Sequence, residues 1–542
     1  MMKKLFTTLL SCCLFFSGDV RSQDSLSIAL GLMGLSFQKA QLDSMRPSVD
    51  FQRAQIMALR EASFPNALPD PLVFMPPLNP ARIPSAQTDI RFGLEEQVDM
   101  PEELSDLAFY PVHRLAALIR SGKITSVALT QLFLDRLRQY GDTLACVITI
   151  TDSLALAQAS KADEELLQGT YRGPLHGIPY GIKDLFAVNG YRTTWGAMPY
   201  KDQSIAEDAA VVRKLREAGA VLVAKLTLGA LAWGDVWYGG QTKNPWNLTQ
   251  GSSGSSAGSA AATVAGLVPF AIGTETWGSI VSPATRCGAT GLRPTFGRVS
   301  RSGAMVLSWS MDKAGPICHD AVDCALVFDA IRGVDGKDPA LRAFPFNYDA
   351  TKDVRRLRIG VLNHEIQSES LNAVNDSILI ALLKQEGFDL VSKSLPTDLP
   401  VEALSLILEA EAGAAFDELT RSGRDTLMVR QMLWPNTLRV SRLIPAVEYI
   451  QANRLRYQLT VAFNTMMQDI DVLIAPSLGS ENLITNLTGH PCVVLPDGSY
   501  RDHHPGTITL VGNHFDEAAI LLFARYLQDI TPYEEEIPPG FD

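Results

Sequence analysis

The sequence has few of the residues that nucleic-acid binding and metal binding require. Only 20% of its 542 residues are charged, and 59 acidic residues against 47 basic ones give a formal net charge of −12. A phosphate-binding surface needs clustered Lys and Arg, and no long basic run follows the N-terminus. No CxxC pair or Cys/His cluster has the spacing of a zinc site. We therefore expect no nucleic-acid partner, no metal and no other cofactor.

Cysteines are also sparse and do not form a disulfide framework. Two of the seven lie near the N-terminus, and the remaining five are scattered and odd in number. This distribution predicts buried free thiols, with one disulfide at most, which the sequence cannot place. The five are Cys146, Cys287, Cys318, Cys324 and Cys492.

The apolar run at the N-terminus is too short to cross a membrane. Lys3 and Lys4 precede the apolar residues Leu5–Phe16, which is the pattern of an export signal. Cleavage after Ser22 would remove residues 1–22 and leave an exported protein, periplasmic or secreted. An alternative is a lipoprotein anchored through Cys12, because Leu9–Cys12 resembles the bacterial lipobox.

Residues 23–97 read as an accessory segment. Helical periodicity over residues 24–65, interrupted at Arg46–Pro47, predicts a helical hairpin. The proline-rich stretch Pro65–Pro84 predicts an extended strap or linker. The expected inward face of the hairpin consists of Leu26, Leu30, Met33, Leu35, Ile56, Met57 and Leu59.

From residue 98 to 535 helical and strand patterns alternate, without a repeat or a clear second boundary. The strands are continuously apolar, which implies a sheet covered by helices on both faces, so we expect one large α/β domain. The expected strands include Ile178–Ala187, Val221–Ala224, Gly266–Ile272, Leu357–Leu362 and Asp471–Pro476. The expected helices include Ser126–Tyr140, Ser153–Gly169, Ala209–Glu217, Asp323–Ile331, Asp376–Glu386, Leu404–Thr420, Ala446–Ile470 and Asp516–Gln528.

The stretch Gly251–Pro294 contains two glycine-flanked serines, Ser255 and Ser279. Ser/Gly runs are often linkers. Here the run leads at once into Ala260–Ile272, which reads as a buried helix of small residues followed by a buried strand. The start of such a helix directs free N–H groups at the serines. We therefore expect a site and not a linker.

One lysine, Lys183, ends the apolar segment that begins at Leu175. A serine hydroxyl needs a neighbouring base to become a nucleophile. Lysine can be that base only when it is neutral, so burial must lower its pKa from about 10.4. The alternative is a structural lysine whose amine pairs with Asp184. Two serines and one lysine in apolar surroundings favour a serine hydrolase whose base is not histidine.

These motifs resemble the amidase signature family. The likeness lies in Ser253–Ser259, Gly273–Ser279, Cys287–Ser300 and Leu175–Asp184, and it covers roughly residues 100–530. Further matching segments are Asn244–Asn247, Met311–Pro316 and Asp471–Pro476. The resemblance implies an α/β fold with a mixed, mostly parallel central sheet and hydrolysis of an amide carbon–nitrogen bond.

The resemblance also implies a role for each matching residue. Ser279 would attack the amide carbonyl, and Ser255, after a peptide bond that is cis in the family, would bridge it to neutral Lys183. Backbone N–H groups of Thr276, Trp277, Gly278 and Ser279 would bind the oxyanion. Water would then hydrolyse the acyl-enzyme. The substrate would be a small-molecule or peptide amide, and a homodimer is left open.

Trp277 departs from the family pattern, which usually has glycine there. Tryptophan disfavours positive φ, so the oxyanion loop must accept an ordinary backbone at this position. We hypothesise that the indole forms a wall of the acyl site and narrows the accepted substrates. Val281–Ser282 also replaces the arginine or other polar residue often found after the nucleophile. Without that polar residue, we expect the substrate pocket to be less suited to a substrate with a charged acid group.

Three other interpretations stay open. Gly254–Gly258 matches the G-x-S-x-G elbow of esterases, with Ser256 as nucleophile. The family also includes glutamine-hydrolysing components of amidotransferases, although an export signal fits them poorly. The third interpretation is a protein that binds an amide without cleaving it, which only Trp277 favours. The esterase scheme would draw its histidine from His490, His503, His504 and His514.

Overall fold

The computed structural model describes residues 25–59, 61, 65–68, 70, 72–78, 83, 85–396, 398–500 and 504–542. The chain divides into two compact units, the first ending at Pro65 and the second running from Asn66 to Asp542. The expected export signal and Cys12 lie outside the described residues. The predicted boundaries of the accessory segment and the catalytic domain stay predictions.

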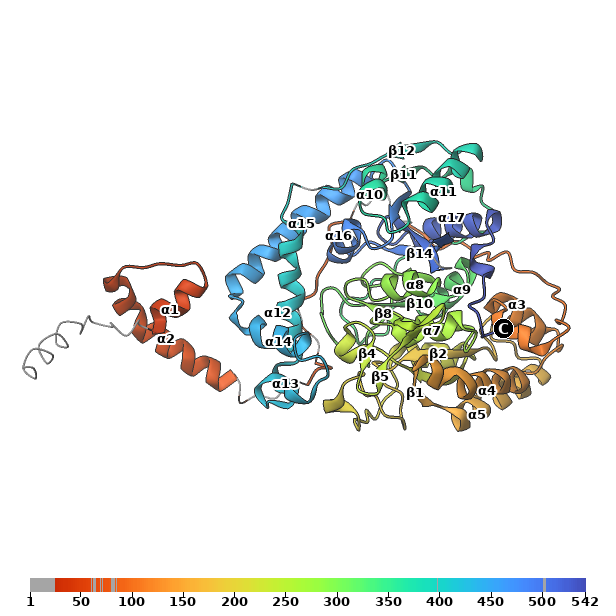
Figure 1. Cartoon of the computed structure of the whole chain (residues 1–542), viewed down its shortest axis with the longest axis horizontal. Coiled ribbons are helices and arrows are strands. Elements are labelled where there is room, and N and C mark those ends of the chain that lie inside the picture. The colour runs from red at the N-terminus through yellow and green to blue at the C-terminus, as the bar shows by residue number, and fades with distance from the viewer. Residues whose placement is uncertain are drawn as a thin grey trace, which may run out of the picture. The chain divides into compact units, whose positions relative to one another are not determined.

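The first unit contains helices α1 (Ser25–Leu32) and α2 (Lys39–Leu59) (Figure 1). The expected interruption at Arg46–Pro47 is wrong, because α2 continues through Pro47. The φ that proline imposes is itself helical, so here it removes one N–H donor without ending the helix. The predicted inward face is also wrong, since neither helix buries a residue. Two helices alone have too little surface to enclose an apolar face.

An 11-stranded sheet forms the centre of the second unit (Figure 1). The strand order is β1-β3-β2-β8-β10-β9-β14-β15-β13-β11-β12. The strands are β1 (Val147–Ile150), β2 (Pro179–Lys183), β3 (Val221–Leu226), β8 (Phe270–Glu275), β9 (Thr290–Arg293), β10 (Lys313–Cys318), β11 (Ile359–Val361), β12 (Leu390–Ser392), β13 (Val472–Pro476), β14 (Cys492–Tyr500) and β15 (His504–Gly512). Two small ribbons pair β4 (Val236–Trp237) with β5 (Gly240–Gln241) and β6 (Lys243–Asn244) with β7 (Asn247–Gly251).

The predicted mixed sheet in one large α/β domain is confirmed, with a larger antiparallel share than expected. Within the described part of the sheet, four pairings are parallel and six are antiparallel. The parallel pairings join β3, β2 and β8 on one side and β13, β11 and β12 on the other. Four antiparallel strands, β9, β10, β14 and β15, lie in the sheet between these two parallel groups. They contain Gly, Pro or Asp, which are rare inside strands, so their sequences did not predict strands.

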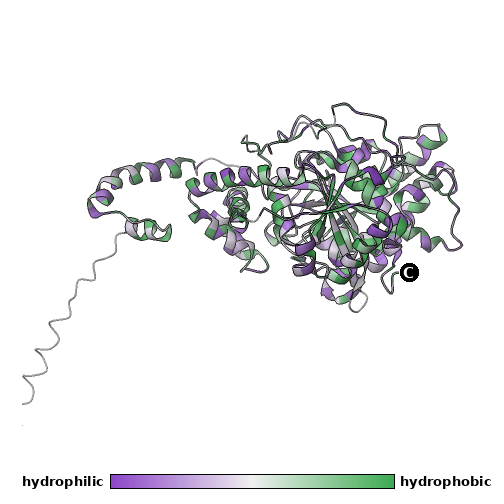
Figure 2. Ribbon diagram, turned by 90° about the horizontal axis from the view of Figure 1, so that it is seen from above, coloured by the Kyte–Doolittle hydropathy of each residue, from purple (hydrophilic) through white to green (hydrophobic). Residues whose placement is uncertain are grey.

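Helices surround this sheet, and in Figure 2 they carry hydrophilic and hydrophobic residues along the same helix. Every residue of β2, β3, β10 and β13 is buried, as expected for strands covered on both faces. The helices are α3 (Val112–Arg120), α4 (Ser126–Leu144), α5 (Asp152–Leu167), α6 (Ala210–Glu217), α7 (Ala257–Val264), α8 (Val281–Cys287), α9 (Ala321–Ile331), α10 (Asn363–Ser368), α11 (Ala373–Gln385), α12 (Leu406–Ala415), α13 (Asp417–Arg421), α14 (Trp434–Val440), α15 (Ala446–Met467), α16 (Ser480–Thr488) and α17 (Glu517–Ile530).

One predicted helix, Leu404–Thr420, is divided in the structure. Helix α12 ends at Ala415 and α13 begins at Asp417. The break at Phe416, with φ −114° and ψ 27°, leaves the ring of Phe416 buried beside Trp195, with ring centroids 6.1 Å apart.

The proline-rich strap is fixed to the second unit. The Asn66 side chain donates to Val306 O (2.9 Å) and accepts from Val306 N (2.8 Å). Farther along, the guanidinium of buried Arg456 lies 3.5 Å from the ring centroid of Phe74. Asn464 donates to Pro77 O over 2.7 Å. The described part of the strap is thus held at Asn66, Phe74 and Pro77 by contacts with side chains or backbone of later segments.

The small-residue helix α7 is buried along its whole length and contacts β8 and β2. Since β2 and β8 are parallel neighbours, Lys183 and Glu275 both end their strands at the same edge of the sheet. The turn after Glu275 contains Ser279 and leads into α8. Ligands in α/β sheets commonly bind at this carboxyl edge of parallel strands.

Candidate active site

The amine of Lys183 lies among hydroxyl and carbonyl oxygens. Its Nζ is 2.8 Å from Ser255 Oγ, 3.0 Å from Ser256 Oγ, 2.8 Å from Thr274 Oγ1 and 3.3 Å from Thr274 O. No carboxylate in the described part of the chain forms an ion pair with Lys183. The lysine side chain is fully buried. Burial lowers the pKa of Lys183 well below its usual value, which favours a neutral amine.

Asp184, the neighbour that could have paired with Lys183, pairs with Lys225 instead. Asp184 Oδ1 lies 2.6 Å from Lys225 Nζ, and both side chains are completely buried. The other oxygen of Asp184 accepts from the backbone N–H and the hydroxyl of Thr194. The structural alternative proposed for Lys183 is therefore wrong.

The two adjacent serines have different surroundings. The peptide bond between Gly254 and Ser255 is cis. Ser256 Oγ donates to Thr274 O and accepts from Thr274 N, both over 3.1 Å. The hydroxyl of Ser256 thus ties the start of α7 to β8. These hydrogen bonds favour a structural role for Ser256 and not the role of nucleophile in an esterase.

Two histidines of the esterase scheme, His490 and His514, form hydrogen bonds with groups other than Ser256. His490 bonds to Thr488 Oγ1 and Asn464 Oδ1, and His514 bonds to Thr488 O. Their rings are buried with centroids 3.7 Å apart. His503 lies outside the described residues.

Ser279 lies near the end of the turn that joins β8 to α8. Ser279 is 8% exposed, and its carbonyl accepts from Ser256 N over 3.1 Å. The hydroxyls of Ser279 and Ser255 form no direct hydrogen bond among the described residues. The N–H groups of Trp277, Gly278 and Ser279 likewise have no acceptor in the described chain. They are available to a ligand.

Glu275 holds this turn from inside the protein. Its Oε2 accepts from Ile280 N (2.8 Å) and Val281 N (2.9 Å), the first N–H groups after Ser279. Its Oε1 lies 2.7 Å from Arg293 Nη1. Burial alone would raise the pKa of Glu275, but the charge of Arg293 and these hydrogen bonds lower it to about 2. The sequence motif did not predict that Glu275 would hold the turn through these contacts.

Trp277 adopts the ordinary backbone that was expected, because its φ is not positive whereas Gly278 has φ 80°. Its side chain is 46% exposed. Thr276, by contrast, is nearly buried, and its hydroxyl donates to Asp312 Oδ1 over 2.6 Å. The turn is thus fixed at Thr276 and open to solvent at Trp277.

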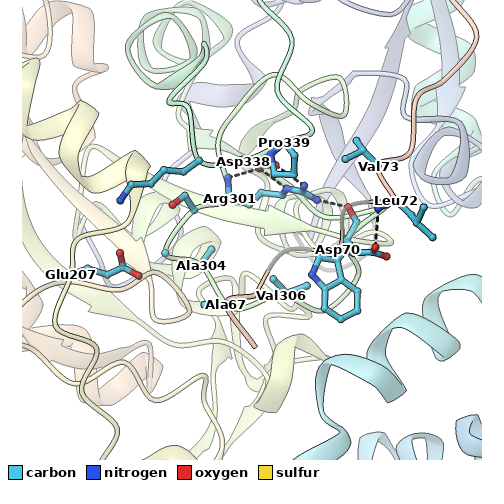
Figure 3. A pocket seen from close by; sticks show the side chains of 14 residues that line it. Ala67, Asp70, Leu72, Val73, Glu207, Arg301, Ala304, Val306, Asp338 and Pro339 are labelled. Carbon is cyan, nitrogen blue, oxygen red and sulfur yellow. Dashed lines mark hydrogen bonds and ion pairs between the residues drawn. The ribbon is translucent and has the colours of Figure 1, made fainter. Parts of the chain in front are cut away.

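A cavity of about 110 Å³ lies between the strap and residues 301–309 (Figure 3). Figure 3 shows Arg301 pointing to Asp338, and their ion pair measures 2.8 Å. A smaller cavity, lined by Thr274 and Thr276 among others, shares Arg301 with it. Ser279 lines neither cavity, although Thr276 of the same turn lines the smaller one.

One group of side chains has the composition of a metal site. His113, Asp320 and Asp323 place one ligand atom each within 4.8 Å of one another. Their atoms are already engaged, because Asp323 accepts from Val112 N and His113 N while Asp320 pairs with His113. The cluster caps the N-termini of α3 and α9.

Known proteins share the sequence motifs of a family and the fold of this chain. The Amidase family model matches residues 128–483. Two curated relatives are glutamyl-tRNA(Gln) amidotransferase subunits, one from Thioalkalivibrio sulfidiphilus (32% identical over 80% of this chain and 99% of the relative) and one from Halorhodospira halophila (34% over 80% and 99%). The native peptide amidase of Stenotrophomonas maltophilia is a structural neighbour, with a TM-score of 0.72, 28% identity and coverage of 81% of this chain and 100% of that one. A bacterial aryl acylamidase shares the fold at a TM-score of 0.72 and 21% identity, over 80% of this chain and 99% of its own.

The chain belongs to the Amidase family. It is an enzyme that hydrolyses amide carbon–nitrogen bonds. Among the helices of the described residues, none is long and apolar enough to cross a membrane.

Proposed function

We propose that Lys183, Ser255 and Ser279 hydrolyse the amide through an acyl-enzyme. The observation that carries this proposal is the buried amine of Lys183, 2.8 Å from Ser255 Oγ, next to an Asp184 that pairs elsewhere. A neutral amine can accept a proton, whereas an ion-paired ammonium cannot.

In the proposed first step, Ser279 Oγ attacks the carbonyl carbon of the substrate. Its proton passes to Ser255 Oγ, and the proton of Ser255 passes to Lys183 Nζ. The tetrahedral intermediate collapses when the carbon–nitrogen bond breaks. Lys183 returns its proton through Ser255 to the departing nitrogen, which leaves as an amine. Water then attacks the ester of Ser279 by the same relay and releases the acid.

The negative charge of the intermediate would be bound by the N–H groups of Trp277, Gly278 and Ser279, with Thr276 at the start of the turn. Removing one such donor typically costs about 3–4 kcal/mol of transition-state stabilisation. The contact between the hydroxyls of Ser255 and Ser279 would close when substrate binds, since catalytic hydrogen bonds often tighten only in the complex.

Labelling with a serine-directed phosphonate and peptide mapping of the adduct tests the assignment. We expect the adduct on Ser279 and no adduct in Ser279→Ala. An adduct on Ser256 would instead support the esterase scheme. A panel of matched amides and esters adds a second test, because a relay that protonates the leaving nitrogen predicts amide cleavage at rates similar to ester cleavage.

A second candidate function is glutamine hydrolysis within an amidotransferase. The observation that favours it is the 32–34% identity to proteins named as glutamyl-tRNA(Gln) amidotransferase subunits. Purification from the native cell with a partner protein, and release of ammonia from glutamine, would support this alternative. A free enzyme active on other amides would exclude it.

We also propose that residues 1–22 direct export, with cleavage after Ser22 and the lipoprotein form as the alternative. Cell fractionation and mass spectrometry of the mature N-terminus test this. A full-length chain in the cytoplasm would contradict export, and a lipid-modified Cys12 would support the anchored form.

A further inference from the structure

A chain of hydrogen bonds connects the buried carboxylate of Glu275 to α16. Asn486 Nδ2 donates to Glu275 Oε1 (2.8 Å), and it also donates to Asn482 Oδ1 (2.8 Å) and Asn482 O (2.9 Å). Both asparagines belong to α16, one turn apart. No part of the proposed proton relay requires this chain.

The chain fixes which way each carboxamide points. An ionised carboxylate only accepts hydrogen bonds, and the pKa of Glu275, lowered by Arg293 against the effect of burial, is about 2. The atom of Asn486 that faces Glu275 must therefore be Nδ2. The same Nδ2 faces Asn482, so the facing atom of Asn482 must be the acceptor Oδ1. The Nδ2 of Asn482 then points away from the chain.

That second amide nitrogen lies beside the turn that carries the nucleophile. A β-carbon built on Gly278 would be 3.1 Å from Asn482 Nδ2. Asn482 is 6% exposed, and its Nδ2 has no acceptor among the described residues. A donor with a fixed orientation and no internal acceptor stands next to Gly278 and thus one residue from Ser279.

We infer that Asn482 selects the acyl part of the substrate by donating from Nδ2 to an oxygen acceptor in the acyl chain. The favoured substrates are therefore amides whose acyl group carries a second carbonyl, as in N-acylated amino acids and peptides. This inference rests on the proposed role of Ser279. A site built to donate to a substrate discriminates against the analogue that lacks the acceptor, because that analogue displaces water from the donor without replacing its hydrogen bond.

Two fluorophosphonates of equal chain length test the inference on the full-length protein. One carries an amide carbonyl in the substituent that mimics the acyl chain, and the other carries methylene groups in its place. We expect the wild type to react faster with the carbonyl compound. In Asn482→Ala and Asn482→Leu the rate for that compound should fall about 5- to 150-fold, which is the loss of about 1–3 kcal/mol expected for a lost hydrogen-bond partner. The rate for the methylene compound should change less than about threefold.

Asn513→Ala is the matched control. Asn513 is also a nearly buried asparagine at 7% exposure, and its Nδ2 donates to Ile470 O over 3.0 Å. It should change both rates equally. The Asn482→Asp variant keeps the acceptor for Asn486 but replaces the donor, so it should react more slowly with the carbonyl compound than Asn482→Ala does.

The outcomes separate the two proposals. Labelling of wild-type Ser279 without preference for the carbonyl compound would overturn the role of Asn482 and leave the nucleophile intact. Equal losses for both compounds in Asn482→Ala, with a lower Tm, would assign Asn482 a structural role only. A wild type that is not labelled on Ser279 would overturn both proposals.

Discussion

Arg293 Nη1 lies 2.7 Å from Glu275 Oε1, and neither side chain is exposed. Removing one partner of such a pair leaves an unpaired charge inside the protein. We expect Glu275→Gln to lower the free energy of unfolding by about 3–5 kcal/mol. Donors face both oxygens of Glu275, so the NH2 group of glutamine would oppose either the N–H groups of Ile280 and Val281 or those of Arg293 and Asn486, and activity should fall too. Urea unfolding and turnover of one amide measure both effects.

The control for that variant is an exposed pair. Asp135 lies 2.9 Å from Arg138, with side chains 61% and 46% exposed. Asp135→Asn should change the free energy of unfolding by less than about 1 kcal/mol, because water already solvates both charges. A similar loss in both variants would contradict the importance assigned to the buried pair.

Lys183→Met should abolish the relay and lower kcat/KM by about 10²–10⁴-fold, the usual contribution of a general base. It should also alter the pH dependence of stability. Because the folded-state pKa of Lys183 is lowered, the unfolded chain binds a proton that the folded chain does not, and the stability of the wild type rises with pH in that range. The variant lacks this contribution.

Denaturation of both proteins at pH 7 and at pH 10 measures the difference. We expect the wild type to gain stability relative to Lys183→Met on going to the higher pH. An unchanged difference would show that Lys183 is protonated to the same extent in both states, which would contradict its role as a neutral base.

The adjacent serines should respond differently to alanine. We expect Ser255→Ala to lower kcat/KM by about 10²–10⁴-fold at nearly unchanged Tm, because the relay loses its middle hydroxyl. Ser256→Ala should mainly lower stability, by about 1–3 kcal/mol, since Thr274 loses its partner. Kinetics and thermal unfolding distinguish the two. Loss of activity in Ser256→Ala alone would revive the esterase interpretation.

His113 should stabilise the fold in acid and lose this effect in alkali. Burial alone would lower its pKa, but Asp320, 3.1 Å from His113 Nε2, and Asp323 and Glu95 nearby raise it to about 9. A pKa raised above the unfolded value near 6.5 contributes stability that is complete below pH 6.5 and lost as pH rises through 9. The contribution is roughly 3 kcal/mol.

The measurement compares the wild type with His113→Gln at pH 6 and pH 9.5. The stability difference should be large at pH 6 and small at pH 9.5. His364→Gln, at an exposed position, is the control and should show no such trend. A difference independent of pH would mean that His113 is not charged in the folded state.

The sequence predicted the strands β2, β3, β8, β11 and β13 and the site motifs, because their signals are local. The segment Ile178–Ala187 contains β2, and the small residues after Ser256 form α7 as expected. The middle of the sheet was missed, because β14 and β15 include Pro496, Asp497 and Pro505, and only their partner strands make this stretch extended.

The surroundings of the site could not be read from the motifs. Asn482 and Asn486 lie about 200 residues from Glu275 in the chain, and nothing in their local sequence connects them to the turn. The pairing of Asp184 with Lys225 is likewise a tertiary choice, made where β2 and β3 run side by side. The motifs predicted which residues form the site, but the partners of these residues depend on tertiary packing.

All five cysteines of the described chain are free and buried. Burial raises the pKa of Cys146 and of Cys492 to about 12, so almost no thiolate is available at neutral pH. In a chain that lacks residues 1–22, and with them Cys12 and Cys13, a maleimide dye should therefore leave the native enzyme unmodified and react only after the fold opens. The rate of dye incorporation would report unfolding events directly, without any engineered residue.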